Sequence, residues 1–310
     1  MKLGTTGSTV CWVTTNQRKH GSMKGFALYA ERQFVERSVS FRPIASQTYG
    51  LYMRWTILGY EEPGLIHSDH FREDRSYREA VYSKGASVLR MLEYVVGDST
   101  FARLMRTYSD RWRFRDPTSN DFEAVAEEVS GMELDWFFDQ WLRSTRTCDY
   151  SIRGLTNEKS ESLAGDGTYR VTIGLENKDL IHMAIDQVLT LEDESTRKLI
   201  IPVGWIPKNE SNAKVLPRWD WVDRSYLATV QLKQKAVYAE IDPSLRLADL
   251  NRPNNSSRVL GKPKVYWVKR RSRYRPIDQY AISVRPSVWF SERDGFRVGA
   301  LEFGSAFANR

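Results

Sequence analysis

The sequence predicts an α+β protein in which a helical region precedes a region of β-strands. Residues 25–147 repeat apolar side chains at helical spacing, between residues that typically begin or end helices. Residues 148–245 instead hold short apolar runs, several of which alternate with a period of two. A last alternating segment, residues 276–310, surrounds an Arg-Asp-Gly turn. The predicted order is therefore a helical domain, a small β-sandwich and a C-terminal β-hairpin.

The clearest predicted helix follows Ser76. Together with Glu79, this serine matches a capping box, in which two side chains satisfy the free amides at a helix start. Gly97 is expected to end the helix, because glycine readily adopts the left-handed backbone found there. The expected buried stripe consists of Val81, Gly85, Val88, Leu89, Leu92, Val95 and Val96.

Further helices are predicted on both sides of this one. Helical spacing begins at Gly25, and a second helix is expected over residues 45–58. Downstream, Thr118 is expected to begin a helix that Gly131 ends, and residues 134–142 form a short helix rich in aromatic side chains. Residues 1–24 show no clean period and are interpreted as a degraded N-terminal segment.

The strands of the predicted β-sandwich are short. They are expected over residues 169–175, 183–191, 199–205, 228–232 and 237–241. Residues 246–275 are predicted to be a linker. The alternation in residues 276–310 also fits a strand pair at the start of a membrane β-barrel or a larger sheet that continues past the last residue.

The positive charge of the chain is local. Its net charge is +7, and the basic tract, residues 261–275, holds seven lysines and arginines and no acidic residue. Aromatic residues are interleaved with these charges, which is typical of contacts with nucleic acid or an anionic membrane. A plain solvated linker is the first interpretation of the tract. If it binds a partner, a membrane surface contacted by residues 262–275 is favoured because the tract precedes aromatic strands, and no nucleic acid is expected.

Targeting signals are absent from the sequence. No run of about 18 apolar residues is present, so no transmembrane helix is expected. The first residues lack an apolar stretch of signal-peptide length, which indicates either a cytoplasmic protein or a misplaced start. Localisation therefore stays open, with association of the parent protein with the cell envelope as one hypothesis.

Several ordered motifs carry a family resemblance. Residues 25–31 (GFALYAE) and 82–86 (YSKGA), with Tyr77 five positions before Tyr82, are followed by WFFDQWL at residues 136–142. This succession resembles the gluzincin zinc aminopeptidases, the family of membrane alanyl aminopeptidase and leukotriene hydrolase. The resemblance covers about residues 20–150. It implies the helical half of a thermolysin-like catalytic domain, a zinc cofactor in the parent family, and removal of N-terminal residues from peptide substrates.

The zinc ligands of that family are missing. The resemblance places the third ligand, a glutamate, at Lys24, and the two histidines of an H-E-x-x-H motif near Met1 and Thr5, although the first histidine is His20. A lysine ammonium cannot coordinate zinc. The sequence therefore predicts no metal ligands, no bound zinc, and an inactive fragment of a zinc aminopeptidase. The alternative is a non-catalytic binding or scaffold domain of the cell envelope.

Tyr82 is the one catalytic residue that the resemblance assigns. A phenol with an ordinary pKa of about 10 stays protonated at neutral pH and can donate a hydrogen bond to an oxyanion. The resemblance implies this role in the ancestral enzyme. The alternative is that Tyr82 only packs at the start of a helix.

Three other features suggest weaker hypotheses. His67 and His70, near two acidic residues, would suit a metal ion, but they lie in a predicted polar loop. Carboxylates near the aromatic helix suggest glycosidase chemistry, but such aromatics usually fill a core; they are Glu133, Asp135 and Asp139. Cys11 and Cys148 form no metal or disulfide pattern and are expected to be unpaired.

Overall fold

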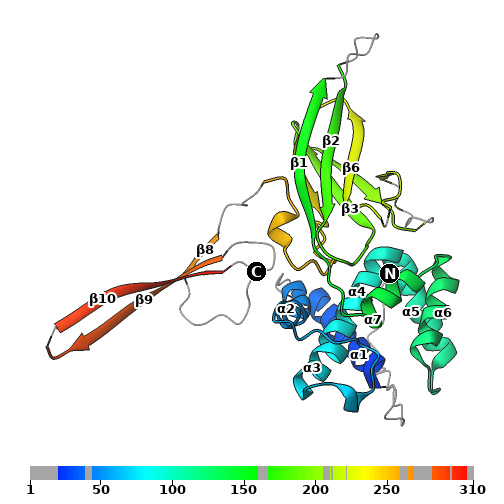
Figure 1. Cartoon of the computed structure of the whole chain (residues 1–310), viewed down its shortest axis with the longest axis horizontal. Coiled ribbons are helices and arrows are strands. Elements are labelled where there is room, and N and C mark those ends of the chain that lie inside the picture. The colour runs from blue at the N-terminus through cyan, green and yellow to red at the C-terminus, as the bar shows by residue number, and fades with distance from the viewer. Residues whose placement is uncertain are drawn as a thin grey trace.

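The computed structural model describes residues 20–38, 44–159, 167–204, 210, 212–220, 222–258, 264–267, 281–293 and 295–305. Helices form the first part of the described chain, two small sheets follow, and a long hairpin extends away from both (Figure 1). The predicted α+β class, with the helices first and a hairpin last, is confirmed. No helix among the described residues is both long enough and apolar enough to span a bilayer.

The helical region starts with α1 (His20–Ser38) and α2 (Ile44–Ile57). Its remaining elements are η2 (Ser68–His70), α3 (Asp74–Arg78), η3 (Glu79–Lys84), α4 (Gly85–Val96), α5 (Asp98–Trp112), α6 (Ser119–Ser130) and α7 (Asp135–Leu142). Two predicted helix ends are confirmed. Thr118 and Asp121 form a capping box that begins α6, and Gly131 ends it in the left-handed conformation at φ 68°.

The predicted helix start at Ser76 is wrong. The helix begins two residues earlier, at Asp74, and continues through the π-helical segment η3 into α4. Ser76 is buried inside it, with 2% of its surface exposed. The carboxylate of Glu79 accepts a hydrogen bond from the hydroxyl of Ser83 at 2.7 Å. Since this partner lies one turn ahead, Glu79 does not serve as the second half of a capping box.

Two glycines bring α1 against the start of α4. A Cβ atom on Gly25 would lie 2.8 Å from the carbonyl carbon of Gly85, and one on Gly85 would lie 3.1 Å from the Cα of Gly25. Real Cβ atoms essentially never make contacts under 3.0 Å, and a contact of 3.1 Å is tighter than nine in ten of them. The two helices therefore meet backbone to backbone, at the two glycines of the motifs at residues 25–31 and 82–86.

The next region contains two sheets. One has the order β1-β2-β6, formed by β1 (Tyr150–Lys159), β2 (Tyr169–Asn177) and β6 (Ser225–Leu232). The other has the order β5-β4-β3-β7, formed by β5 (Ala213–Val215), β4 (Thr196–Ile201), β3 (Ile185–Leu191) and β7 (Ala236–Ile241). Alternate residues of β2 are buried, as its period predicted. Apolar side chains of both sheets join one continuous core with the helices.

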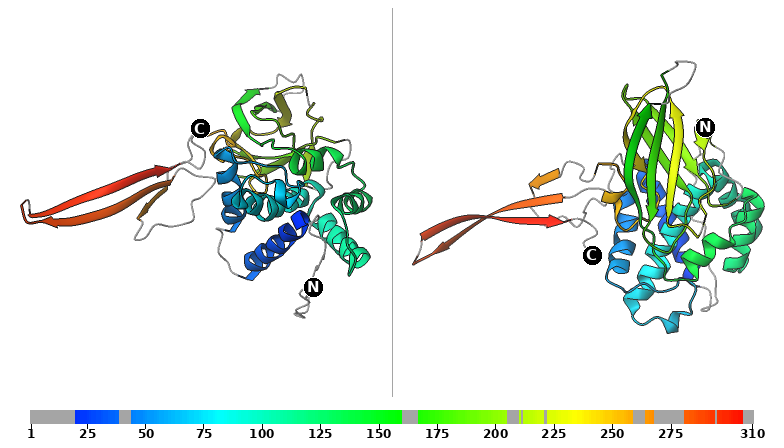
Figure 2. Two further views of the ribbon diagram at one scale, coloured as in Figure 1. Left: turned by 60° about the horizontal axis from the view of Figure 1, so that its bottom comes forward. Right: turned by 45° about the horizontal axis from the view of Figure 1, so that its top comes forward.

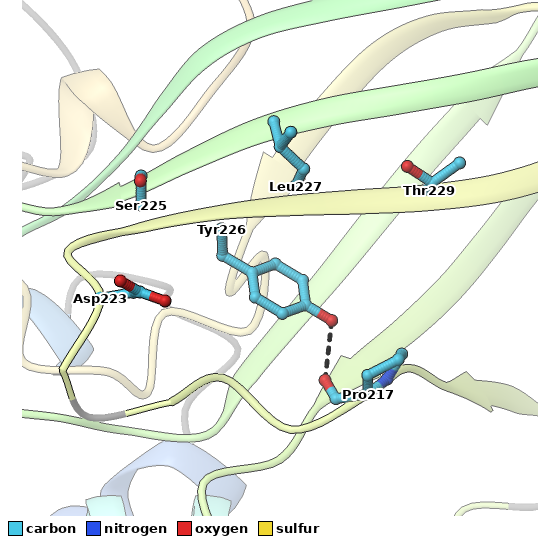
Figure 3. A pocket seen from close by; sticks show the side chains of 6 residues that line it. All are labelled: Pro217, Asp223, Ser225, Tyr226, Leu227 and Thr229. Atoms are coloured by element: carbon cyan, nitrogen blue, oxygen red, sulfur yellow. Dashed lines mark hydrogen bonds between the residues drawn. The ribbon is translucent and has the colours of Figure 1, made fainter.

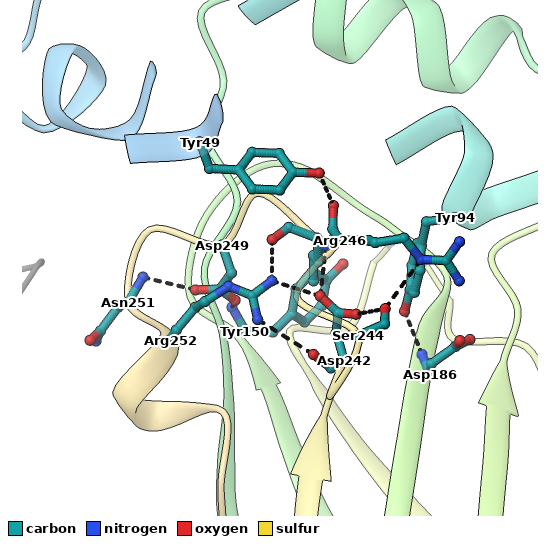
Figure 4. A network of polar contacts seen from close by, with 11 residues as sticks. Tyr49, Tyr94, Tyr150, Asp186, Asp242, Ser244, Arg246, Asp249, Asn251 and Arg252 are labelled. Carbon is teal, nitrogen blue, oxygen red and sulfur yellow. Dashed lines mark hydrogen bonds and ion pairs between the residues drawn. The ribbon is translucent and has the colours of Figure 1, made fainter. Parts of the chain in front are cut away.

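The segment that begins the predicted linker contributes several buried residues, namely Leu247, Ala248, Asp249, Leu250, Arg252 and Asn255. Figure 4 shows its polar contacts with the helices and strands. Arg252 pairs with Asp242 at 2.6 Å, and both side chains are almost fully buried. The Tyr49 hydroxyl, on α2, donates to the carbonyl of Arg246 at 2.5 Å. The backbone N–H of Asp186, on β3, donates to the hydroxyl of Tyr94 on α4 at 2.6 Å. Polar contacts therefore connect the helical region directly to the sheets.

Asp249 is a buried acid within this segment. Its carboxylate accepts hydrogen bonds from the backbone N–H groups of Tyr150 and Asn251, both at 2.8 Å. Burial raises the pKa of Asp249 to about 7, helped by the nearby charge of Asp149 and opposed by Arg252 and the two N–H donors.

The last sheet has the order β10-β9-β8. The predicted hairpin is present as β9 (Ala281–Ser291) and β10 (Gly295–Ser305), paired in antiparallel register. A third strand, β8 (Lys264–Trp267), lies within the basic tract and pairs with β9 in parallel. Figures 1 and 2 show β9 and β10 extending away from the rest of the molecule in every view.

Replacing Gly25 with alanine should destabilise the helical region by about 1–3 kcal/mol, because the new methyl group would force α1 away from α4. Urea unfolding followed by circular dichroism would measure the loss. Gly154→Ala is the matched control, since its Cβ would meet no atom within 4 Å. Equal stabilities for the two variants would contradict the proposed close contact.

The stability of the protein should fall as pH rises from about 4 to about 7. In this window the unfolded chain releases the proton of Asp249, whose ordinary pKa is about 4, while the folded chain retains it. The slope from this group is at most about 1.4 kcal/mol per pH unit. Urea midpoints across this range would measure it. Asp249→Asn should lower stability at every pH and flatten the slope, and an unchanged slope would exclude this assignment.

Candidate functional site

Lys24, Tyr77 and Tyr82 form a cluster of polar groups on the helical region. They come from α1, α3 and η3 respectively. The ammonium of Lys24 donates a hydrogen bond to the Tyr77 hydroxyl at 2.8 Å. It also lies 4.7 Å from the centre of the Tyr77 ring and 5.1 Å from that of Tyr82, within the range of cation–π attraction. The glycine contact explains the grouping, because Lys24 precedes Gly25 and Tyr82 lies one helical turn before Gly85.

The π-helical segment sets the direction of Tyr82. Its side chain is 36% exposed, whereas its neighbours Val81, Ser83 and Lys84 are buried. A π-helical turn inserts one extra residue into a helix, and such turns are frequent at functional sites. The phenol of Tyr82 is therefore available to solvent from an otherwise buried segment.

Lys84 holds η3 in place through buried polar contacts. Its ammonium pairs with the Glu61 carboxylate at 2.6 Å, and the two side chains are 1% and 9% exposed. It also donates to the backbone carbonyls of Glu62 at 3.3 Å and Ser144 at 3.1 Å. A buried ammonium requires such partners, since an unpaired one is strongly destabilising. The lysine of the YSKGA motif is thus structural, and it holds η3 against the loop before η2 and the end of α7.

The charge of Lys24 is stable. The hydrogen bond to Tyr77 raises the pKa of the Lys24 ammonium, the phenol of Tyr82 acts in the same direction, and partial burial opposes both. No carboxylate among the described residues forms an ion pair with it. The cluster therefore presents one positive charge beside two phenols.

This cluster does not fit a zinc ion. A protonated lysine has no lone pair to give to a metal, and its charge repels a cation. The part of the chain that the structure describes contains no group of three or more His, Cys, Asp and Glu side chains suited to a metal. The positions near residues 1–5, where the resemblance implies two histidines, lie outside the described residues.

The histidine pair also lacks a third ligand among the described residues. His67 and His70 lie at η2, with ring centres 5.6 Å apart. One ring nitrogen of His67 accepts a hydrogen bond from the backbone N–H of Asp69, which closes a local turn.

The aromatic helix α7 serves the core. Trp141 is fully buried and directs its indole N–H toward the sulfur of Met183, while Trp136 donates to the Glu133 carbonyl. Asp139 pairs with Arg143 at 2.9 Å. These contacts favour the structural interpretation of the segment over glycosidase chemistry.

A pocket beside β6 is lined by few groups that could take part in a reaction (Figure 3). The hydroxyl of Tyr226 donates to the Pro217 carbonyl at 2.7 Å, and Asp223 carries the one carboxylate among the described residues that line the pocket. Its other lining residues are Ser225, Leu227 and Thr229. Without a second acid, a base or a metal-ligand set on this wall, the pocket does not suggest a reaction.

The role of Lys24 was not predicted from the sequence, which marked it only as a departure from the family pattern. Its partner Tyr77 lies 53 positions away. No local periodicity connects residues so far apart, so only the paired motifs could have suggested the contact.

Comparisons with known proteins agree with the motifs. The peptidase family M1 domain matches residues 13–141. Human glutamyl aminopeptidase is 32% identical over 76 residues, which are 24% of this chain and 8% of that protein. Aminopeptidase N of Escherichia coli is 24% identical over 133 residues, which are 43% of this chain and 15% of that protein.

Among solved structures, Legionella pneumophila aminopeptidase A in complex with aspartic acid aligns with 73% of this chain and 23% of its own. The alignment has a TM-score of 0.44 and 14% identity. The chain thus spans only a small part of each of these relatives. On the family match and the ordered motifs within it, residues 13–141 of this chain are related to part of the catalytic domain of peptidase family M1.

Proposed function

We propose that this chain has lost zinc-dependent hydrolysis and binds peptides without cleaving them. One observation carries the proposal: a stably charged ammonium, that of Lys24, occupies the position at which the family resemblance implies a zinc-binding carboxylate. A positive charge there excludes the metal from that position. The family relationship supplies peptides as the substrate class of the parent enzymes.

The same residues suit a carboxylate. An ammonium held by a hydrogen bond and two aromatic faces loses little freedom when it binds an anion, and charged hydrogen bonds are the stronger ones. The phenol of Tyr82 is partly exposed beside it and can donate a second hydrogen bond. In the ancestral enzyme this donor would face an oxyanion, whereas here it would face a carboxylate oxygen. We assign the site to the C-terminal or side-chain carboxylate of a bound peptide.

A second partner is supported by the basic tract. Residues 261–275 hold seven basic and no acidic residues, and β8 places one of these basic residues, Lys264, in one sheet with the hairpin. Charge concentrated on one segment attracts anionic lipid and weakens as salt is added. We therefore propose a cell-envelope location at an anionic membrane surface, rather than contact with nucleic acid.

The chain should bind much less than one zinc ion per molecule and should not hydrolyse alanyl-anilide substrates. The Lys24 ammonium at the third-ligand position is the physical reason. Equilibration with zinc, desalting, metal analysis and an activity assay would check this, with an intact M1 aminopeptidase treated in parallel. One zinc per chain together with chelator-sensitive hydrolysis would refute the proposal.

Replacing Lys24 with methionine should weaken the binding of a peptide with a free C-terminal carboxylate by about 10–100-fold, because a charged hydrogen bond is lost. Isothermal titration with the free peptide and its C-terminal amide would measure the effect. Lys235→Met is the matched control, since Lys235 also lies over a tyrosine ring, 5.6 Å from the centre of Tyr169. Equal affinities for the two peptides, or equal losses in the two variants, would exclude this site.

A further inference from the structure

The hairpin carries an uncovered apolar face. In the register of β9 and β10, Phe290 lies opposite Phe296 with ring centres 5.0 Å apart, and Val288 lies opposite Val298. Paired residues point to the same side of a sheet. The four side chains are between 61% and 79% exposed. They form a continuous apolar surface, called the hairpin face below, on a strand pair that extends away from the rest of the molecule (Figure 2).

The opposite side of the same strands is polar and aromatic. Trp289 is 49% exposed and lies opposite Arg297. Tryptophan and arginine together are typical of the boundary between water and lipid, where an aromatic ring and a charged head both find a partner. The hairpin is therefore amphipathic rather than apolar all round.

The charges of the hairpin and the basic tract have different distributions. Residues 281–305 hold three basic and three acidic residues and are balanced, whereas the basic tract is purely positive. The parallel pairing of β8 with β9 begins at Lys264 and Ala281, so the tract enters the sheet at the base of the hairpin. Lys264 of the tract therefore lies at the base of the hairpin, whereas the exposed apolar residues lie toward its turn.

We propose that the hairpin face docks on an anionic lipid bilayer, with the basic tract supplying the attraction. The inference rests on the membrane location proposed above. The strands lie along the interface rather than entering tip first, because the turn after Ser291 holds the exposed Glu292. A carboxylate at the tip is costly in the lipid core, whereas a hairpin lying flat keeps it in water. The exposed phenylalanines and valines enter the headgroup boundary.

Sedimentation of the full chain with vesicles tests this. Vesicles of phosphatidylcholine and phosphatidylserine are compared with pure phosphatidylcholine vesicles, at low and at high salt. The wild-type chain should pellet with the anionic vesicles and less so at high salt. The double variant F290S/F296S should bind at least about tenfold more weakly, because it lacks the two aromatic rings that the bilayer would bury on binding. Its circular dichroism should match that of the wild type, since both residues are exposed.

The matched control is F34S/F114S, which removes two equally exposed phenylalanines, 71% and 88%, from the helical region. It should bind the vesicles like the wild type. If the wild type binds and F290S/F296S binds equally well, the hairpin inference is overturned and the basic tract alone accounts for binding. If the wild type does not bind anionic vesicles, the proposed membrane location is refuted as well. If the chain dimerises without lipid and F290S/F296S abolishes the dimer, a second copy covers the hairpin face and the inference is overturned.

Discussion

The contact between Gly25 and Gly85 is the constraint on which the helical region depends. With no side chain on either residue, α1 and α4 approach until their backbones touch. This close approach of the two helices allows the ring of Phe26 to contact Tyr108 and Phe122, and its centre lies 5.8 and 5.0 Å from theirs. The same approach brings the ammonium of Lys24 next to Tyr77 and Tyr82. Two residues without side chains thus determine where both the aromatic core and the polar cluster form.

Close backbone packing and a buried ion pair fix the position of η3. The contacts that hold η3 are the glycine crossing and the buried pair of Lys84 and Glu61. A lysine at position 24 is accommodated because its charge is stabilised locally by a phenol oxygen and two aromatic faces. The contacts that position η3 are therefore separate from those that stabilise the charge of Lys24.

Ion pairs and a shared apolar core join the helical region to the two sheets. Arg246 pairs with Asp98 at the start of α5, and the buried pair of Arg252 and Asp242 holds the segment that follows β7. Buried charges need such partners, because an unpaired charge in a core is strongly destabilising. The hairpin differs, since its two long strands pair with each other and with the short β8. Its exposed face lies on strands that extend away from the helices and the other two sheets, which leaves it free to meet an external surface (Figure 1).

The sequence by itself determined the elements that depend on local spacing. Helical periodicity, the cap at Thr118, the ending at Gly131 and the alternation of β9 are properties of neighbouring residues, and so is the succession of motifs that indicates the family. Only the tertiary structure decided the start of the helix before Ser76, the burial of several residues in the segment 246–258, the pairing of β8 within the basic tract and the surroundings of Lys24. Each of these depends on partners tens of residues away. Burial and pairing between such partners outweigh local preference, because burying apolar side chains stabilises more than a single cap or turn, and a buried charge without its partner is strongly destabilising.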